Sequence, residues 1–194
     1  MTQHYYLVAS LPLLLFDGPP PFSSAAFLEM CREQLAEDDH ALLARISFAA
    51  LRSRPGDPAA WSAYAAWETA LRNELAAQRA QRLGVSPDPF LREAPFTVGL
   101  PALVKEALGA GTPWAVETAL DRRRWSYLDE LEAGTQFSLG RLVVYRLKLL
   151  LLERKALFRL EPGRRLFTEG YARVLGDAAA WTSADRPNGY GEST

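Results

Sequence analysis

Between Pro58 and Gly84 the sequence runs for about 27 residues without another proline or glycine. Apolar residues at helical spacing, among them Tyr64 and Leu71, follow one face of this stretch. Proline suits the first helical turn because the donor that it lacks is not used there, and the preceding Asp57 is a typical N-cap. The stretch therefore predicts one helix, about 40 Å long at 1.5 Å per residue.

Prolines, glycines and capping residues divide the rest of the chain into shorter stretches with the same apolar period. Ser23 or Ser24, Asp38 or Asp39, and Thr112 are the expected N-caps of three of these helices. Besides the long helix, the expected helices cover about 24–35, 39–51, 100–108, 113–133, 138–160 and 164–175. Before them, residues 5–16 form an apolar stretch that ends at Pro19–Pro21, and we expect it to lie on the core as an arm.

These stretches predict an all-α fold, a helical bundle of about six to seven helices. The bundle is either a single domain over 1–175 or two small lobes over 1–84 and 100–175. The intervening residues 85–99 contain three prolines and are expected to hold at most one helical turn. Residues 176–194 are rich in Gly, Ser and Asp without an apolar stripe, and we expect a disordered tail.

The helix expected over 138–160 is the most apolar of the set and should be packed on several sides. Arg146 and Lys148 interrupt its apolar run. Either their stems carry the charges to the surface, or the charges meet carboxylates on a neighbouring helix or on another protein chain. The tryptophans at helical spacing are expected to lie mostly in the core. They are Trp61, Trp67, Trp114 and Trp125.

Composition argues against most catalytic and metal chemistry. The two histidines, His4 and His40, are expected at the surface, and the single cysteine, Cys31, cannot form an intramolecular disulfide or a cysteine-based zinc cluster. The sequence contains no P-loop, dinucleotide-binding, serine-hydrolase or HExxH motif. We therefore expect a protein that is not an enzyme and that has no catalytic residues, no metal and no cofactor.

The charge distribution argues against nucleic acid as a partner. The formal net charge is −1, although residues 121–175 carry twelve Lys/Arg against seven Asp/Glu. Arg122, Arg123 and Arg124 are consecutive, so on a helix they point in different directions and do not form one patch.

No segment is long and apolar enough to predict a membrane-spanning helix. The apolar run 7–16 has no preceding Lys or Arg and contains Pro12, which argues against an export signal. We expect a cytoplasmic location.

Four stretches of the sequence resemble a small bacterial family whose genes lie in V/A-type ATP synthase operons of spirochaetes, chlamydiae and bacteroidetes. The order of these stretches is more specific than any one of them. They are Tyr5-Tyr6-Leu7-Val8-Ala9-Ser10-Leu11-Pro12, Leu71-Arg72-Asn73-Glu74-Leu75 with Arg79 and Leu83-Gly84, Arg124-Trp125-Ser126-Tyr127-Leu128-Asp129-Glu130-Leu131, and Tyr145-x-x-Lys148-Leu149 continuing into Glu153-Arg154. One departure is Lys155, where the family's pattern has a tryptophan.

The resemblance implies a non-catalytic accessory or central-stalk-like subunit of a V/A-type ATP synthase that couples or assembles the soluble and membrane sectors. Such a protein would stand in for the helical funnel that joins the central shaft of the synthase to its membrane ring. Its partners would be synthase subunits, which would hold it peripherally at the inner membrane.

The expected partner surface uses basic residues of the C-terminal half: Arg141, Arg146, Lys148, Arg154, Arg164 and Arg165. The alternative is a free-standing cytoplasmic enzyme or ligand-binding helical bundle, with a pocket bounded by Arg72, Glu74 and Arg146.

Overall fold

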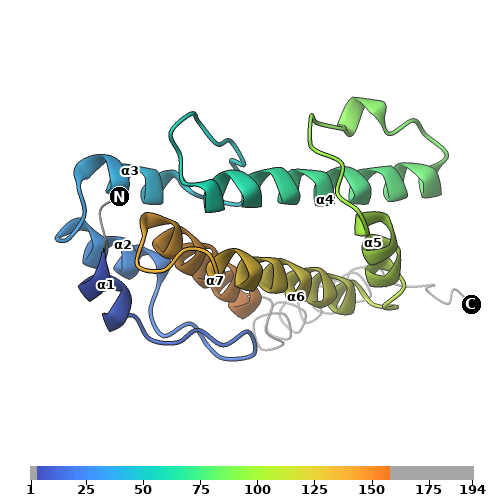
Figure 1. Ribbon diagram of the computed structural model, residues 1–194. Coiled ribbons are helices and arrows are strands. Elements are labelled where there is room, and N and C mark those ends of the chain that lie inside the picture. Colours follow the sequence, from blue (N-terminus) through green and yellow to red (C-terminus); the bar gives the residue numbers. More distant parts are fainter. Residues whose placement is uncertain (1–3, 158–194) are drawn as a thin grey trace, which may run out of the picture. The chain divides into compact units, whose positions relative to one another are not determined.

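The computed structural model describes residues 4–157, and the regular structure of these residues is entirely helical (Figure 1). The prediction of an all-α helical bundle is confirmed. The helices are α1 (Tyr5–Ser10), α2 (Ser24–Arg32), α3 (Glu37–Arg45), α4 (Ala59–Leu83), the 3-10 helix η1 (Asp88–Phe90), α5 (Leu100–Leu108), α6 (Pro113–Glu132) and α7 (Leu139–Leu157). Residues up to Glu153 belong to one compact unit.

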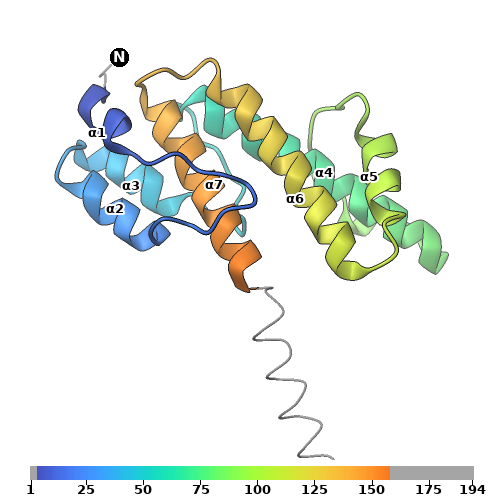
Figure 2. The same cartoon turned by 90° about the horizontal axis from the view of Figure 1, so that it is seen from below.

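Within this unit, α4 and α6 lie side by side and both contact α5, while α2 packs on α3 (Figure 2). Two apolar clusters form the core. The first joins α1–α3, the start of α4, the second half of α6 and α7. The second joins the middle of α4 with α5 and the first half of α6. Tyr127 on α6 packs against both clusters. The predicted lobes and the predicted tail extend into residues outside the described part of the chain.

Most helix boundaries agree with the local signals in the sequence. Ser23 Oγ accepts a hydrogen bond from Ala26 N at 3.1 Å, and Thr112 Oγ1 accepts one from Ala115 N at 3.2 Å, so both are N-caps as predicted. Gly84 ends α4 with a φ of 68°, a left-handed conformation that costs glycine little. Residues 85–99 hold the single turn η1, and α7 is buried on several sides.

Other boundaries were predicted wrongly. Residues 5–10 of the expected arm form α1, which buries Leu7 in the first cluster. The N-cap of α3 is Ala36, so Asp38 and Asp39 lie in the first helical turn. There their charges are favourable because they face the positive end of the helix dipole. The same helix ends at Arg45 and not near residue 51, because Ile46 turns into an extended conformation and is fully buried.

The start of α4 also differs from the prediction. Its N-cap is Pro58, and no side chain of the described residues caps it. The carboxylate of Asp57, the expected cap, instead forms an ion pair with Arg45 and accepts the backbone N–H of Arg54 at 2.7 Å. Asp57 therefore does not cap α4, and its carboxylate stabilises the loop between α3 and α4.

Candidate functional site

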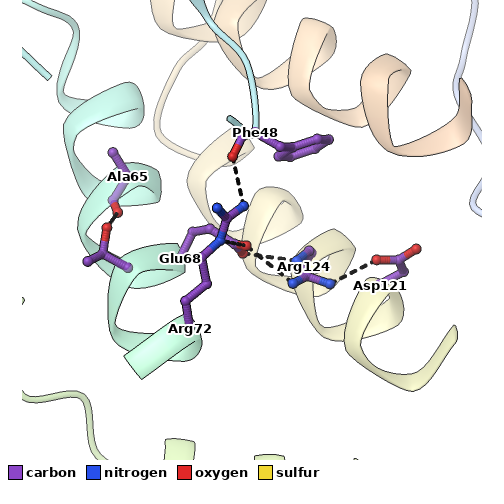
Figure 3. Close-up of polar contacts among 7 residues, drawn as sticks. Phe48, Ala65, Glu68, Arg72, Asp121 and Arg124 are labelled. Atoms are coloured by element: carbon purple, nitrogen blue, oxygen red, sulfur yellow. Dashed lines mark hydrogen bonds and ion pairs between the residues drawn. The ribbon is translucent and has the colours of Figure 1, made fainter. Parts of the chain in front are cut away.

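A buried ion-pair network links α4 to α6 (Figure 3). Arg124 of α6 donates to both carboxylate oxygens of Glu68 of α4, with Nε–Oε2 at 2.9 Å and Nη2–Oε1 at 3.2 Å. Its Nη1 also donates to Asp121 Oδ1 at 2.9 Å. Glu68 is 0%, Asp121 3% and Arg124 5% exposed, so these charges are removed from water and depend on one another.

A second arginine extends this network to the α3–α4 loop. Arg72 Nε donates to Glu68 Oε1 at 2.9 Å, and Arg72 Nη2 donates to the Phe48 carbonyl oxygen at 2.8 Å (Figure 3). Burial is the largest single influence on the pKa of Arg124 and lowers it. The charge of Glu68, its hydrogen bond to Arg124 and the weaker attractions of Tyr64 and Glu117 together outweigh burial, so the net shift is upward. The network therefore holds two helices and a loop in one register.

Neither Glu68 nor Asp121 was predicted from the sequence to be a site residue. A signal for Glu68 was present, because it stands three residues before Leu71 and four after Tyr64 on the apolar face of the long helix. A carboxylate on such a face needs a buried cation, but nothing local indicates which of the chain's arginines supplies it.

The neighbouring arginines of α6 point away from Arg124, as predicted. Arg122 lies 3.4 Å from Asp17 Oδ2 and 4.6 Å from the centre of the Phe16 ring, and Arg123 lies 3.7 Å from Glu106 Oε2. The three consecutive arginines thus contact three different parts of the fold and form no common patch.

Two predicted partner-binding cations meet at Glu132 of α6. Arg141 and Lys148 both form ion pairs with this carboxylate. Lys148 Nζ also lies 2.5 Å from Asp129 Oδ1 and 5.1 Å from the centre of the Trp125 ring. Lys148 is 7% exposed, and burial lowers its pKa. The sequence left two alternatives for Lys148. Its charge does not reach the surface but pairs with carboxylates of the neighbouring helix α6.

The remaining predicted cations lie elsewhere. Arg146 is 6% exposed and donates from Nη1 to the Ser24 carbonyl oxygen at 3.2 Å, and burial lowers its pKa. Arg154 is half-buried at the start of a second unit of the chain. Arg164 and Arg165 lie outside the described residues. A partner-binding role for the six cations stays a prediction.

The residues proposed for the rival pocket have separate contacts. Arg72 belongs to the buried network, Glu74 accepts a hydrogen bond from Gln78 at 2.9 Å, and Arg146 contacts α2. The expectation that the histidines are exposed is wrong for His4, which is 8% exposed because the first helix folds onto the core. His40 is half-buried, and its Nε2 lies 3.1 Å from the Leu28 carbonyl oxygen.

Exposed apolar side chains are concentrated in the connection between α4 and α5. Of thirteen large exposed apolar residues in the described part of the chain, six lie in residues 83–98, here called the 83–98 segment. They are Leu83, Val85, Phe90, Leu91, Phe96 and Val98. Part of the segment borders a groove of about 450 Å³ whose lining includes Trp67 and Tyr127, stacked at 4.5 Å. Exposed apolar residues gathered in this way are typical of protein-binding surfaces.

Three of the four tryptophans expected in the core are buried, and Trp114 is 49% exposed. None of the described helices is long and apolar enough to cross a membrane. In residues 4–157 no group of three or more His, Cys, Asp or Glu side chains could hold a metal ion. Comparisons with protein-family models, with curated proteins and with solved structures give no match.

Proposed function

We propose that this protein is a non-catalytic accessory or central-stalk-like subunit of a V/A-type ATP synthase. In this role it couples or assembles the soluble and membrane sectors and is held at the inner membrane by synthase subunits. The proposal rests on the resemblance of four separated stretches to a family encoded in V/A-type ATP synthase operons. A protein with this role needs helices that keep a fixed register and a surface that binds other proteins.

The observation that carries the proposal is that the resembling stretches meet in space. Tyr145 Oη of the fourth stretch donates to the Pro12 carbonyl oxygen of the first at 3.1 Å. Lys148 of the fourth stretch is paired with Asp129 of the third. These contacts make the resembling stretches parts of one packed unit, as a shared fold with that family would require.

The second and third stretches are linked through one shared carboxylate. Arg72 of the second and Arg124 of the third both bind Glu68. The resembling arginines therefore stabilise the packing of α4 on α6, which keeps the 25-residue helix α4 in place. A long helix fixed in this way supports a role in spanning and joining subunits, and the 83–98 segment supplies an apolar surface for a synthase partner.

The decisive experiment is affinity purification of the tagged full chain from native membranes, followed by mass spectrometry. We expect recovery of V/A-type ATP synthase subunits with the wild type. Failure of the wild type to recover any synthase subunit at normal expression would refute the proposal and favour the free-standing enzyme or ligand-binding bundle.

Variants locate the partner surface. Phe96→Ser with Val98→Ser removes two apolar side chains that are 86% and 87% exposed, and we expect reduced recovery of synthase subunits with an unchanged helical spectrum. Leu13→Ser with Leu15→Ser, at 81% and 61% exposure, is the matched control outside the 83–98 segment. Equal recovery of synthase subunits with both double variants would show that the 83–98 segment is not the partner surface.

A separate pair tests the basic surface predicted from the sequence. Arg164→Glu with Arg165→Glu reverses two charges, which should weaken binding to an acidic partner because attraction becomes repulsion. Undiminished recovery would exclude these two residues from the partner surface.

A further inference from the structure

A cavity of about 770 Å³ lies within the compact unit, where the starts of α3 and α4 approach the α6–α7 turn. Its lining includes His4, Asp38, Asp39, Arg54, Ala59 and Ala60. Cavities of this size accommodate small metabolites. None of these residues takes part in the proposed contact with the synthase.

One wall of the cavity has a buried imidazole nitrogen without a hydrogen-bond partner among the described residues. The His4 side chain is 6% exposed, yet its Nε2 has no hydrogen-bond partner among the described residues. Asp39 Oδ2 lies 3.8 Å from this nitrogen, too far for a hydrogen bond. The His4 backbone N–H donates to the Phe137 carbonyl oxygen at 2.7 Å, which fixes the residue at the α6–α7 turn. Buried polar atoms are normally satisfied, so this nitrogen is available to a hydrogen-bonding group that enters the cavity.

The start of α4 supplies donors to the same cavity. No side chain of the described residues caps this 25-residue helix, since Asp57 is bonded to Arg45 and to Arg54 N. The first-turn residues Ala59 and Ala60 line the cavity together with Arg54. Uncapped first-turn N–H groups and the helix dipole attract an anionic group.

We propose that this cavity binds a small zwitterionic metabolite. Its ammonium group is held by His4 Nε2, Asp38 and Asp39, and its carboxylate by the first turn of α4 with Arg54. An ammonium group has three donors, which match these three acceptors when the imidazole is neutral and carries its proton on Nδ1. A carboxylate accepts several N–H donors at once. This inference does not rest on the proposed synthase role.

The test uses the full chain and a series of ω-amino carboxylates, from glycine to 6-aminohexanoate, titrated by calorimetry. Each is compared with the alkylamine and the alkanoate of the same length. We expect at least one length to bind about tenfold or more tightly than both of its single-charge analogues, because only the zwitterion satisfies both ends of the cavity. If no zwitterion exceeds its analogues, the proposal is wrong.

Variants then assign the two ends. Asp39→Asn and, separately, Asp38→Asn should weaken the best zwitterion several-fold and leave alkanoate binding unchanged. Asp88→Asn, an exposed acid at η1 outside the cavity, is the control and should bind as the wild type does. Retained zwitterion affinity in both cavity variants, with folding verified by circular dichroism, would overturn the assignment of the ammonium site.

Discussion

Replacing Arg124 by methionine removes the cation that holds the α4–α6 network together. The substitution keeps much of the side-chain length but deletes two N–H donors to Glu68 and one to Asp121. Removing one partner of a buried ion pair typically costs about 3–5 kcal/mol, because the other charge is left unpaired away from water. Arg72 still reaches Glu68 at 2.9 Å, so we expect a value near the lower end, about 3 kcal/mol.

For a unit of this size, each kcal/mol lowers the melting temperature by about 2–4 °C, so the expected loss is about 6–12 °C. Thermal unfolding followed by far-UV circular dichroism at neutral pH measures it. Arg123→Met is a matched control, the same change at the preceding residue of the same helix. Arg123 is exposed and 3.7 Å from Glu106, so its loss should cost under about 0.5 kcal/mol.

Equal melting temperatures for the two variants would refute the reasoning that the buried network stabilises the fold. A second comparison tests the mechanism. Adding Glu68→Met to Arg124→Met should restore part of the loss, because it removes the carboxylate that the first substitution leaves without its main partner. A further loss of stability in the double variant would show that the carboxylate of Glu68, left without Arg124, is not the main source of the cost.

Three other predictions concern single residues. Cys31 is fully buried and burial raises the pKa of its thiol to about 12, so a thiol reagent at mildly alkaline pH should label it only after denaturation; rapid labelling of the native chain would contradict its burial. Burial raises the pKa of Tyr145 to about 12, so the folded state holds the phenol proton more tightly than the unfolded state. The stability that this pKa difference contributes is complete below about pH 10 and is lost as the pH rises through about 12. The difference in phenolate absorbance between wild type and Tyr145→Phe measures this, and ionisation near pH 10 would contradict it. Gly84→Ala should cost about 1 kcal/mol in the free energy of unfolding because its φ is 68°, whereas Gly134→Ala, without a positive φ and with open space around it, is the control; equal stabilities would argue against strain at Gly84.

Local sequence signals determined most of the helices. The proline-free run predicted 58–84 and the helix covers Ala59–Leu83, while the prediction of 100–108 coincides with α5. Serine, threonine and glycine act on the nearest backbone groups, so their effects can be read without knowing the rest of the fold. The candidate partner residues on α7 can be recognised as cations from the sequence. Their burial and their ion-pair partners could not be predicted from it.

Predictions were wrong where a residue has a tertiary contact that replaces its local role. Asp57 has the ideal position for an N-cap, yet its carboxylate binds Arg45 and Arg54 N. His4 was expected in solvent and is buried beside the α6–α7 turn. Arg45 lies 12 residues before Asp57 on another helix, and Phe137 lies across the fold from His4, so no rule about helix starts contains these partners.

By itself, the sequence determined the helical class and the positions of the helices, because periodicity, caps and breakers act over a few residues. Only the tertiary structure decided which charges are buried. Arg123 and Arg124 are adjacent and chemically identical, yet the first is exposed and the second is 5% exposed. The difference is made by Glu68, 56 residues away, because a buried charge must be compensated by opposite charges or hydrogen-bond acceptors that the fold brings to it.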